Sequence, residues 1–194
     1  MATEQSDSVA PRKPHIVGVA GNWSRPSRTR TLVQAVLESA ARRGLASTAL
    51  LDLVDAGPEL GHTTERSKAK PALAAVLQQI QDADALVVGT AVYKGAYTGL
   101  FKHLFDLFEM DAFARKPVLL TATGASPAHA SVIDYHLRPL FLFFDARVAT
   151  RGLYGLPHDF EASGALGESF LARLERCVDE LAVALAAPAG APGA

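Results

Sequence analysis

The sequence predicts an α/β fold of three layers, in which a parallel sheet is covered by helices on both faces. Short apolar runs typical of buried strands alternate with longer segments of helical spacing, and each run is followed by one such segment. Parallel strands need crossover connections, and the helices that make them cover both faces of the sheet. The chain has 194 residues, 49% of them hydrophobic, which suits one domain with a single well-buried core.

The alternation gives five strands and five helices. The candidate strands are 16–20, 47–53, 85–89, 118–123 and, with a weaker pattern, 147–154. The candidate helices that follow them are 27–43, 71–82, 97–108, 128–144 and 162–186. Pro139 lies inside the fourth helix, so we expect a kink or a wider turn there.

The two ends of the chain are predicted to be tails. Residues 1–14 are mostly polar, with two prolines and no apolar stretch typical of a secretory signal. Residues 187–194 contain only Ala, Pro and Gly, which offer too little apolar surface to fold. We therefore expect disordered tails at 1–14 and 187–194 around a single domain at 15–186.

Composition excludes several classes of function. The net charge of -1 and the scattered basic residues argue against nucleic acid as a partner. No apolar run approaches the roughly 20 residues that span a bilayer, so no membrane contact is expected. The single Cys177 cannot close an internal disulfide, and no Cys and His cluster has zinc spacing. These features fit a cytoplasmic protein without a metal site.

The loop at 21–29 is the first candidate for ligand binding, because parallel sheets bind ligands beyond the carboxyl ends of their strands. It has neither G-x-G-x-x-G nor G-x-x-x-x-G-K-[ST], which argues against a dinucleotide or triphosphate. Hydroxyls, guanidinium groups and a helix N-terminus instead suit a single terminal phosphate. Alternatively, Ser24 or Ser27 only caps the helix and the arginines are solvated. The candidate binding residues here are Asn22, Ser24, Arg25, Ser27, Arg28 and Thr29.

Two further loops follow the third and fourth predicted strands, at 90–100 and 121–127. A tyrosine ring, small residues and glycines at a strand end can form a wall against a flat heteroaromatic ring. Alternatively, Tyr93 and Tyr97 only cover the sheet edge and Lys94 is solvated. The candidate binding residues of these loops are Ala91, Val92, Tyr93, Lys94, Thr123, Gly124 and Ala125.

The three loops together resemble the NAD(P)H-dependent FMN reductase family. The chain is most similar to flavin reductases of two-component alkanesulfonate and methanesulfonate monooxygenase systems. The segments that carry the resemblance, in order, are RPSRT at 25–29, VYKG at 92–95, GLFKHLFDL at 99–107, PVLL at 117–120, TG at 123–124 and DYHLRPLF at 134–141.

The resemblance implies a flavodoxin-like fold with strand order 2-1-3-4-5 and an activity, the reduction of FMN by NADH or NADPH. It assigns the FMN phosphate to the arginines and hydroxyls of 25–29, and the ring to 92–94 with Thr123 and Gly124 on the far side. Ala91 stands where the family usually has Pro, and Ala125 where it has a second Gly. No side chain is expected to act as acid, base or nucleophile, because the flavin carries the chemistry.

Assembly and partners are also expectations. Apolar residues at 140–144, together with Phe101, Leu104, Phe105 and Phe108, exceed what a monomer readily buries, although a tightly packed internal helix is the alternative. The resemblance implies a homodimer or homotetramer, with a widened turn at Tyr135 near the interface. It also implies a flavin-dependent monooxygenase that receives reduced FMN.

Two other functions stay open at this point. One is a reductase of quinones, azo dyes or metal oxyanions that keeps FMN bound. The other is an electron carrier without enzymatic activity, which the charge of -1 disfavours, because carriers that dock on redox partners are strongly acidic. Nothing in the residues selects NADH over NADPH.

Overall fold

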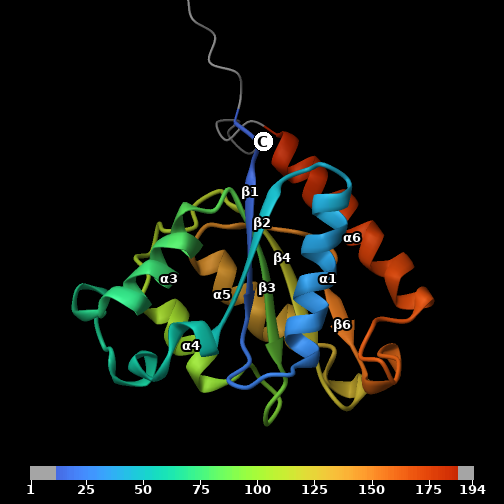
Figure 1. Ribbon diagram of the computed structural model, residues 1–194, viewed down its shortest axis with the longest axis horizontal. Helices are drawn as coiled ribbons and strands as arrows, with labels where there is room; N and C mark the ends of the chain where they lie inside the picture. The colour runs from blue at the N-terminus through green and yellow to red at the C-terminus, as the bar shows by residue number, and fades with distance from the viewer. Residues whose placement is uncertain (1–11, 188–194) are drawn as a thin grey trace, which may run out of the picture.

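A parallel sheet runs through the middle of the molecule in the computed structural model, which describes residues 12–187 (Figure 1). The strand order is β2-β1-β3-β4-β5, with β6 also paired to β4, and every pairing is parallel. This confirms the flavodoxin-like order predicted from the sequence. The strands are β1 His15–Ala20, β2 Ser47–Asp52, β3 Ala85–Ala91, β4 Pro117–Thr123, β5 Arg147–Val148 and β6 Leu153–Gly155.

Helices cover both faces of this sheet. In one core α1 and α6 pack on the sheet, and in the other α3, α4 and α5 do (Figure 1). Adjacent strand residues serve the two cores in turn: Leu86 and Val88 of β3 face one, Ala85 and Val87 the other, and all four are fully buried. The helices are α1 Arg28–Arg42, α2 Leu53–Ala56, α3 Pro71–Asp82, α4 Gly99–Asp106, α5 Arg138–Phe143 and α6 Glu168–Ala186.

The edge strand predicted at 147–154 is split into β5 and β6. Val118 of β4 pairs with Val148, but Thr121 pairs with Leu153, so the edge carries two more residues than β4 between these pairings. Arg138 contacts the segment between β5 and β6. Its guanidinium donates to the carbonyls of residues 149 and 150 at 2.8 and 2.9 Å. Those carbonyls are thereby satisfied outside the sheet.

The helix predicted at 128–144 is also interrupted. A 3₁₀ turn occupies Pro127–His129, a π-helical turn occupies Ile133–Leu137, and α5 begins only after it. Pro139 lies in the first turn of α5, where a missing N–H leaves no helical bond unmade. The wider turn expected near this proline is therefore the π-helical turn, which contains the exposed Tyr135.

Two segments differ from the sequence prediction in length. The helix predicted from residue 162 begins at Glu168, because Gly164 takes a positive φ of 87° in a turn that precedes it. The strand predicted at 47–53 ends at Asp52, and Leu53 begins α2. No element was predicted for residues 54–68, which hold the rest of α2 and two 3₁₀ turns at Pro58–His62 and Arg66–Lys68. A further 3₁₀ turn follows β6 at Pro157–Asp159.

Four apolar residues in α4 and just after it are internal. Phe101, Leu104, Phe105 and Phe108 are buried, and the Phe105 ring lies 4.9 Å from that of Phe141. These residues therefore do not form the exposed apolar surface that the sequence suggested.

The predicted tails lie almost wholly outside the described residues. At the described edge of the first, the Pro14 carbonyl accepts a hydrogen bond from Ser47 N at 2.9 Å, and Arg12 pairs with Asp84. Between residues 12 and 187, no helix combines the length and apolar character needed to cross a bilayer.

Candidate functional site

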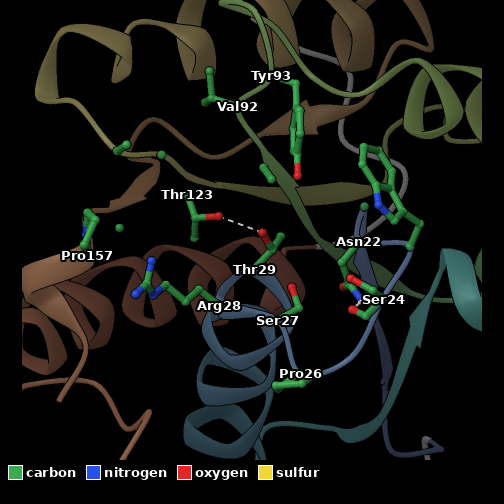
Figure 2. Close-up of a pocket in the computed structure, with 16 residues that line it drawn as sticks. Asn22, Ser24, Pro26, Ser27, Arg28, Thr29, Val92, Tyr93, Thr123 and Pro157 are labelled. Atoms are coloured by element: carbon green, nitrogen blue, oxygen red, sulfur yellow. Dashed lines mark hydrogen bonds between the residues drawn. The ribbon is translucent and has the colours of Figure 1, made fainter. Parts of the chain in front are cut away.

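A pocket of about 340 Å³ opens at the carboxyl end of the sheet, where the loops after β1, β3, β4 and β6 converge (Figure 2). Its volume is within the range of small-molecule sites. The lining residues are Gly21, Asn22, Trp23, Ser24, Pro26, Ser27, Arg28, Thr29, Ala91, Val92, Tyr93, Thr123, Gly124, Ala125, Gly155 and Pro157.

The structure brings together most of the site residues predicted from the sequence. Eleven of the thirteen candidates line this one pocket, although they come from three loops up to a hundred residues apart. The two exceptions are Arg25 and Lys94, which do not line it.

Lys94 is held at the tip of a tight hairpin. Tyr93 and Ala96 exchange two backbone hydrogen bonds at 2.9 and 3.1 Å, and Lys94 and Gly95 between them have positive φ angles of 52° and 83°. This conformation is typical of a two-residue hairpin turn. The turn leaves Tyr93 on the pocket and Lys94 outside the lining.

The start of α1 supplies the polar wall of the pocket. Ser27 is the N-cap, and its hydroxyl accepts a long 3.4 Å bond from Arg30 N, so the capping role considered from the sequence is present. The first backbone N–H groups of a helix have no partner inside it, and here they belong to Arg28 and Thr29. Together with the Arg28 guanidinium they make this end of the pocket suited to an anion.

A hydrogen bond between two buried hydroxyls joins the first loop to the third. Thr29 Oγ1 and Thr123 Oγ1 lie 2.6 Å apart, and the two residues are 2% and 7% exposed (Figure 2). One of these hydroxyls donates to the other, and the proton of the acceptor stays available to a third group. The pair therefore fixes α1 against β4 and leaves one donor at the pocket.

Two aromatic rings stand together at the pocket. Trp23 from the first loop and Tyr93 from the hairpin have ring centroids 5.0 Å apart, tilted by 48°. Both are about half exposed, at 48% and 52%. They present an apolar surface that a planar ligand can contact.

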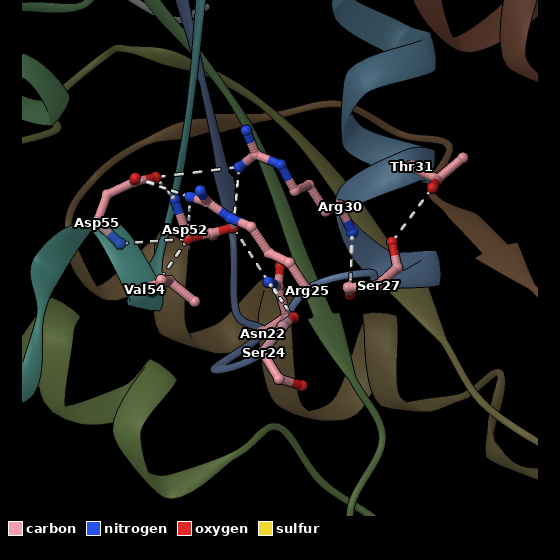
Figure 3. Close-up of polar contacts among 9 residues, drawn as sticks. All are labelled: Asn22, Ser24, Arg25, Ser27, Arg30, Thr31, Asp52, Val54 and Asp55. Atoms are coloured by element: carbon pink, nitrogen blue, oxygen red, sulfur yellow. Dashed lines mark hydrogen bonds and ion pairs between the residues drawn. The ribbon is translucent and has the colours of Figure 1, made fainter.

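Arg25 points to a carboxylate at the end of the neighbouring strand, β2 (Figure 3). Its Nε and Nη2 donate to the two oxygens of Asp52, each at 2.8 Å, and Nη2 also donates to Asp55 at 2.7 Å. Arg30 Nη1 adds a bond to Asp52 at 2.9 Å. The guanidinium predicted to bind phosphate is thus engaged with two carboxylates.

Asp52 is the centre of this network and its side chain is fully buried. It also accepts from Asn22 Nδ2 at 3.1 Å and from Val54 N at 3.0 Å, capping α2. Burial by itself would raise the pKa of Asp52, but the hydrogen bonds from Arg25 and Asn22 and the charge of Arg30 outweigh it and lower the pKa to about 2. Asp52 is therefore a carboxylate throughout the physiological pH range.

The side-chain amide of Asn22 has one oxygen without a described hydrogen-bond partner. Its Nδ2 donates to Asp52 and to the Ser24 carbonyl at 3.0 Å, which fixes the orientation of the amide. Its Oδ1 is buried and has no hydrogen-bond partner within residues 12–187. A buried acceptor without a partner is costly, so a ligand that donates a hydrogen bond would stabilise this position.

Sequence reasoning missed several residues of the site. Gly155 is the last residue of β6 and Pro157 follows it. The weak pattern of the edge strand did not indicate this fourth strand end. Asp52 carried a usable signal, because it is an acidic residue at the carboxyl end of a strand that borders the first loop. The remaining additions lie within the first loop itself: Gly21, Trp23 and Pro26.

Comparison with known proteins agrees with this geometry. The family model of NADPH-dependent FMN reductases matches residues 14–161. An FMN reductase (NADPH) of Pseudomonas aeruginosa is 41% identical over 167 residues, covering 86% of this chain and 90% of the relative. The NADH-dependent FMN reductase SfnF of Pseudomonas fluorescens is 40% identical over 167 residues, covering 86% and 89%.

A solved structure has the same arrangement. The apo form of the NADH:FMN oxidoreductase EMOB superposes with a TM-score of 0.80 at 28% identity, covering 90% of this chain and 91% of that one.

Proposed function

Since the chain belongs to the NADPH-dependent FMN reductase family, we propose that the pocket at the carboxyl end of the sheet holds FMN, with the phosphate at the start of α1. The protein is an NAD(P)H-dependent FMN reductase. FMN held in this pocket would supply the acceptor for a hydride from the nicotinamide. The observation that carries the proposed site is the convergence of a helix N-terminus, an arginine and three small-residue loops on one pocket.

The donors of the pocket fit a phosphate monoester. Arg28, the hydroxyls of Ser24 and Ser27, and the first backbone N–H groups of α1 can each donate to a phosphate oxygen. A dianion at this helix end is also favoured by the helix dipole. In this arrangement Arg25 supports the loop and is not itself a phosphate ligand.

The other end of the pocket fits a flat ring with a hydroxylated chain. Val92 and Tyr93 line it beside Gly124 and Ala125, and a 2.8 Å bond from Val92 N to the Thr123 carbonyl joins the two loops. The free Asn22 Oδ1 suits a hydroxyl donor such as those of the ribityl chain. In this proposal no side chain of the pocket acts as an acid or a base. The protein orients the ring and limits its contact with water.

We also propose that reduced FMN leaves the pocket and supplies a flavin-dependent monooxygenase of the sulfonate type. The half-exposed rings of Trp23 and Tyr93 leave an open route for exchange, which supports a flavin that is product as well as cofactor. A retained flavin would favour reduction of quinones instead. The cytoplasm, where NADH and NADPH are available, is the proposed compartment.

Steady-state kinetics test this function. Oxidation of NADH or NADPH should saturate with added free FMN and be slow without it. Activity with a quinone but not with free flavin would contradict the proposal.

A variant pair locates the phosphate. Arg28→Gln should raise the KM for FMN about tenfold with little change in kcat, because it removes a charge-assisted contact made before the hydride moves. Arg42→Gln, at the exposed far end of α1, is the control and should leave KM unchanged. Equal effects of the two substitutions would exclude a local contact of Arg28 with the phosphate.

A homodimer or homotetramer is proposed through the π-helical turn and α5. Tyr135, Leu142 and Phe143 are 78%, 55% and 65% exposed, which is unusual for large apolar side chains in one short segment. Sedimentation equilibrium of the wild-type protein and of Phe143→Ser tests this assembly. A wild-type monomer at micromolar concentration would contradict it.

A further inference from the structure

The loop that is proposed to bind the FMN phosphate is attached to the end of β2 by a single buried carboxylate. Asp52 receives hydrogen bonds from Asn22, Arg25 and Arg30, which lie at the start of the loop, in its middle and in the first turn of α1 (Figure 3). These three contacts span the residues that also line or flank the pocket.

The attachment is rigid on the side of the sheet. Asp52 is the last residue of β2, paired in register with Ala20 of β1, and its carboxylate accepts the backbone N–H groups of Val54 and Asp55 at 3.0 and 3.3 Å. Asp55 returns the contact by accepting from Asp52 N at 2.9 Å. The position of the carboxylate is thus fixed by contacts within residues 52–55, independently of the loop.

The loop, in contrast, has few other anchors between its ends. Outside this network its described contacts to other parts of the fold lie at the two ends. Gly21 N donates to the Gly89 carbonyl at 2.7 Å at one end. At the other end are the Ser27 cap, the bonds from Thr31 N and Oγ1 to the Ser27 carbonyl, and the Thr29–Thr123 hydroxyl pair. Residues 22–26 are held from the side of β2 mainly by Asp52.

We propose that Asp52 is a positioning residue for FMN binding, which acts through Arg25 and Asn22 to hold the phosphate loop in its binding conformation. This inference rests on the proposed function. It gives Arg25 a different role from that of a phosphate ligand: its guanidinium is neutralised by Asp52 and Asp55 and serves as a bridge between β2 and the loop. The direct charge on the phosphate is then left to Arg28.

The test compares FMN with riboflavin, which has the ring and the ribityl chain but no phosphate. Dissociation constants of both are measured by calorimetry for the wild type, Asp52→Asn and Arg25→Gln. The second variant is on a side chain that is 40% exposed, so it keeps the test available if Asp52→Asn does not fold. Arg12→Gln, in the ion pair with Asp84 at the opposite end of the sheet, is the matched control.

We expect the Kd for FMN to rise at least tenfold in Asp52→Asn and in Arg25→Gln, with less than a threefold change for riboflavin and no change in Arg12→Gln. Equal losses for both ligands would indicate a general role in folding and would overturn the inference. So would FMN binding that is unchanged or tighter in Asp52→Asn, because a released Arg25 would then act as a ligand. If the wild type binds no FMN, it is the proposed function that fails.

A double variant distinguishes an Arg25 that acts through Asp52 from an Arg25 that contacts the phosphate directly. If Arg25 acts through Asp52, the FMN affinity of Asp52→Asn combined with Arg25→Gln should be no weaker than that of the weaker single variant. Multiplied losses would mean that Arg25 contacts the phosphate independently, against the inference.

Discussion

The two ends of the sheet each carry a bidentate arginine–aspartate pair, and the two pairs differ in burial. At the carboxyl end the Asp52 side chain is fully buried beneath Arg25, with Arg30 and Asn22 as further partners. At the amino end Asp84 is 29% exposed, its partner Arg12 is 71% exposed, and the other contact is His15 N at 2.7 Å.

The difference shows that similar ion-pair geometry has different consequences in different surroundings. An exposed pair is screened by water and contributes little to stability. A buried carboxylate depends on its partners, because removing one side leaves uncompensated charges. The buried pair therefore fixes a loop, while the exposed pair mainly ties residue 12 to the start of β3.

The largest contrast is expected in stability. Asp52→Ala should lower the free energy of unfolding by about 3–5 kcal/mol, because Arg25 and Arg30 lose their buried partner. Asp84→Ala should cause a loss several times smaller. Urea unfolding at pH 7 measures both, and similar losses would mean that burial does not distinguish the pairs.

The carboxyl end should also tolerate little added volume. A Cβ on Gly124 would lie 2.1 Å from Tyr154 Oη, which donates to the Ser126 carbonyl at 2.8 Å. Gly124→Ala should therefore destabilise the fold by up to about 3 kcal/mol and weaken FMN binding, as expected for overpacking. Gly99→Ala is the control, since a Cβ there meets nothing within 4 Å. Unfolding curves that coincide for the two variants would refute this.

A smaller effect is expected in the pH dependence of the stability that Asp52 contributes. The pKa of Asp52 falls from 3.8 to about 2 on folding, so its stabilising contribution is complete above pH 3.8 and is lost as the pH falls through 2. The contribution is roughly 2 kcal/mol. The stability difference between wild type and Asp52→Asn, followed by urea unfolding, should shrink from pH 5 to pH 2. A constant difference would contradict the lowered pKa.

Much of the fold could be predicted because its signals are local. Apolar runs and helical spacing gave the first four strands and the helix Pro71–Asp82 with bounds close to those observed. The edge strand could not be predicted as two pieces, because its interruption depends on Arg138 reaching carbonyls eleven and twelve residues away. Contacts of this kind produce no periodic pattern in the sequence.

The site was predictable to the level of its loops. The rule that ligands bind at the carboxyl ends of parallel strands selected loops that do meet in one pocket. The orientation of single side chains was not predictable in the same way. Arg25 turns to Asp52, which is 27 residues away, and Lys94 is directed by a positive φ that only the closed hairpin requires.

Hydrogen–deuterium exchange with and without FMN tests most directly whether the carboxyl-end pocket is the flavin site. FMN should protect amides in 21–29, 91–96 and 123–125, and leave those around His15 and Asp84 at the amino end unchanged. Protection confined to other parts of the sheet, or none in these three loops at saturating FMN, would contradict the proposed site.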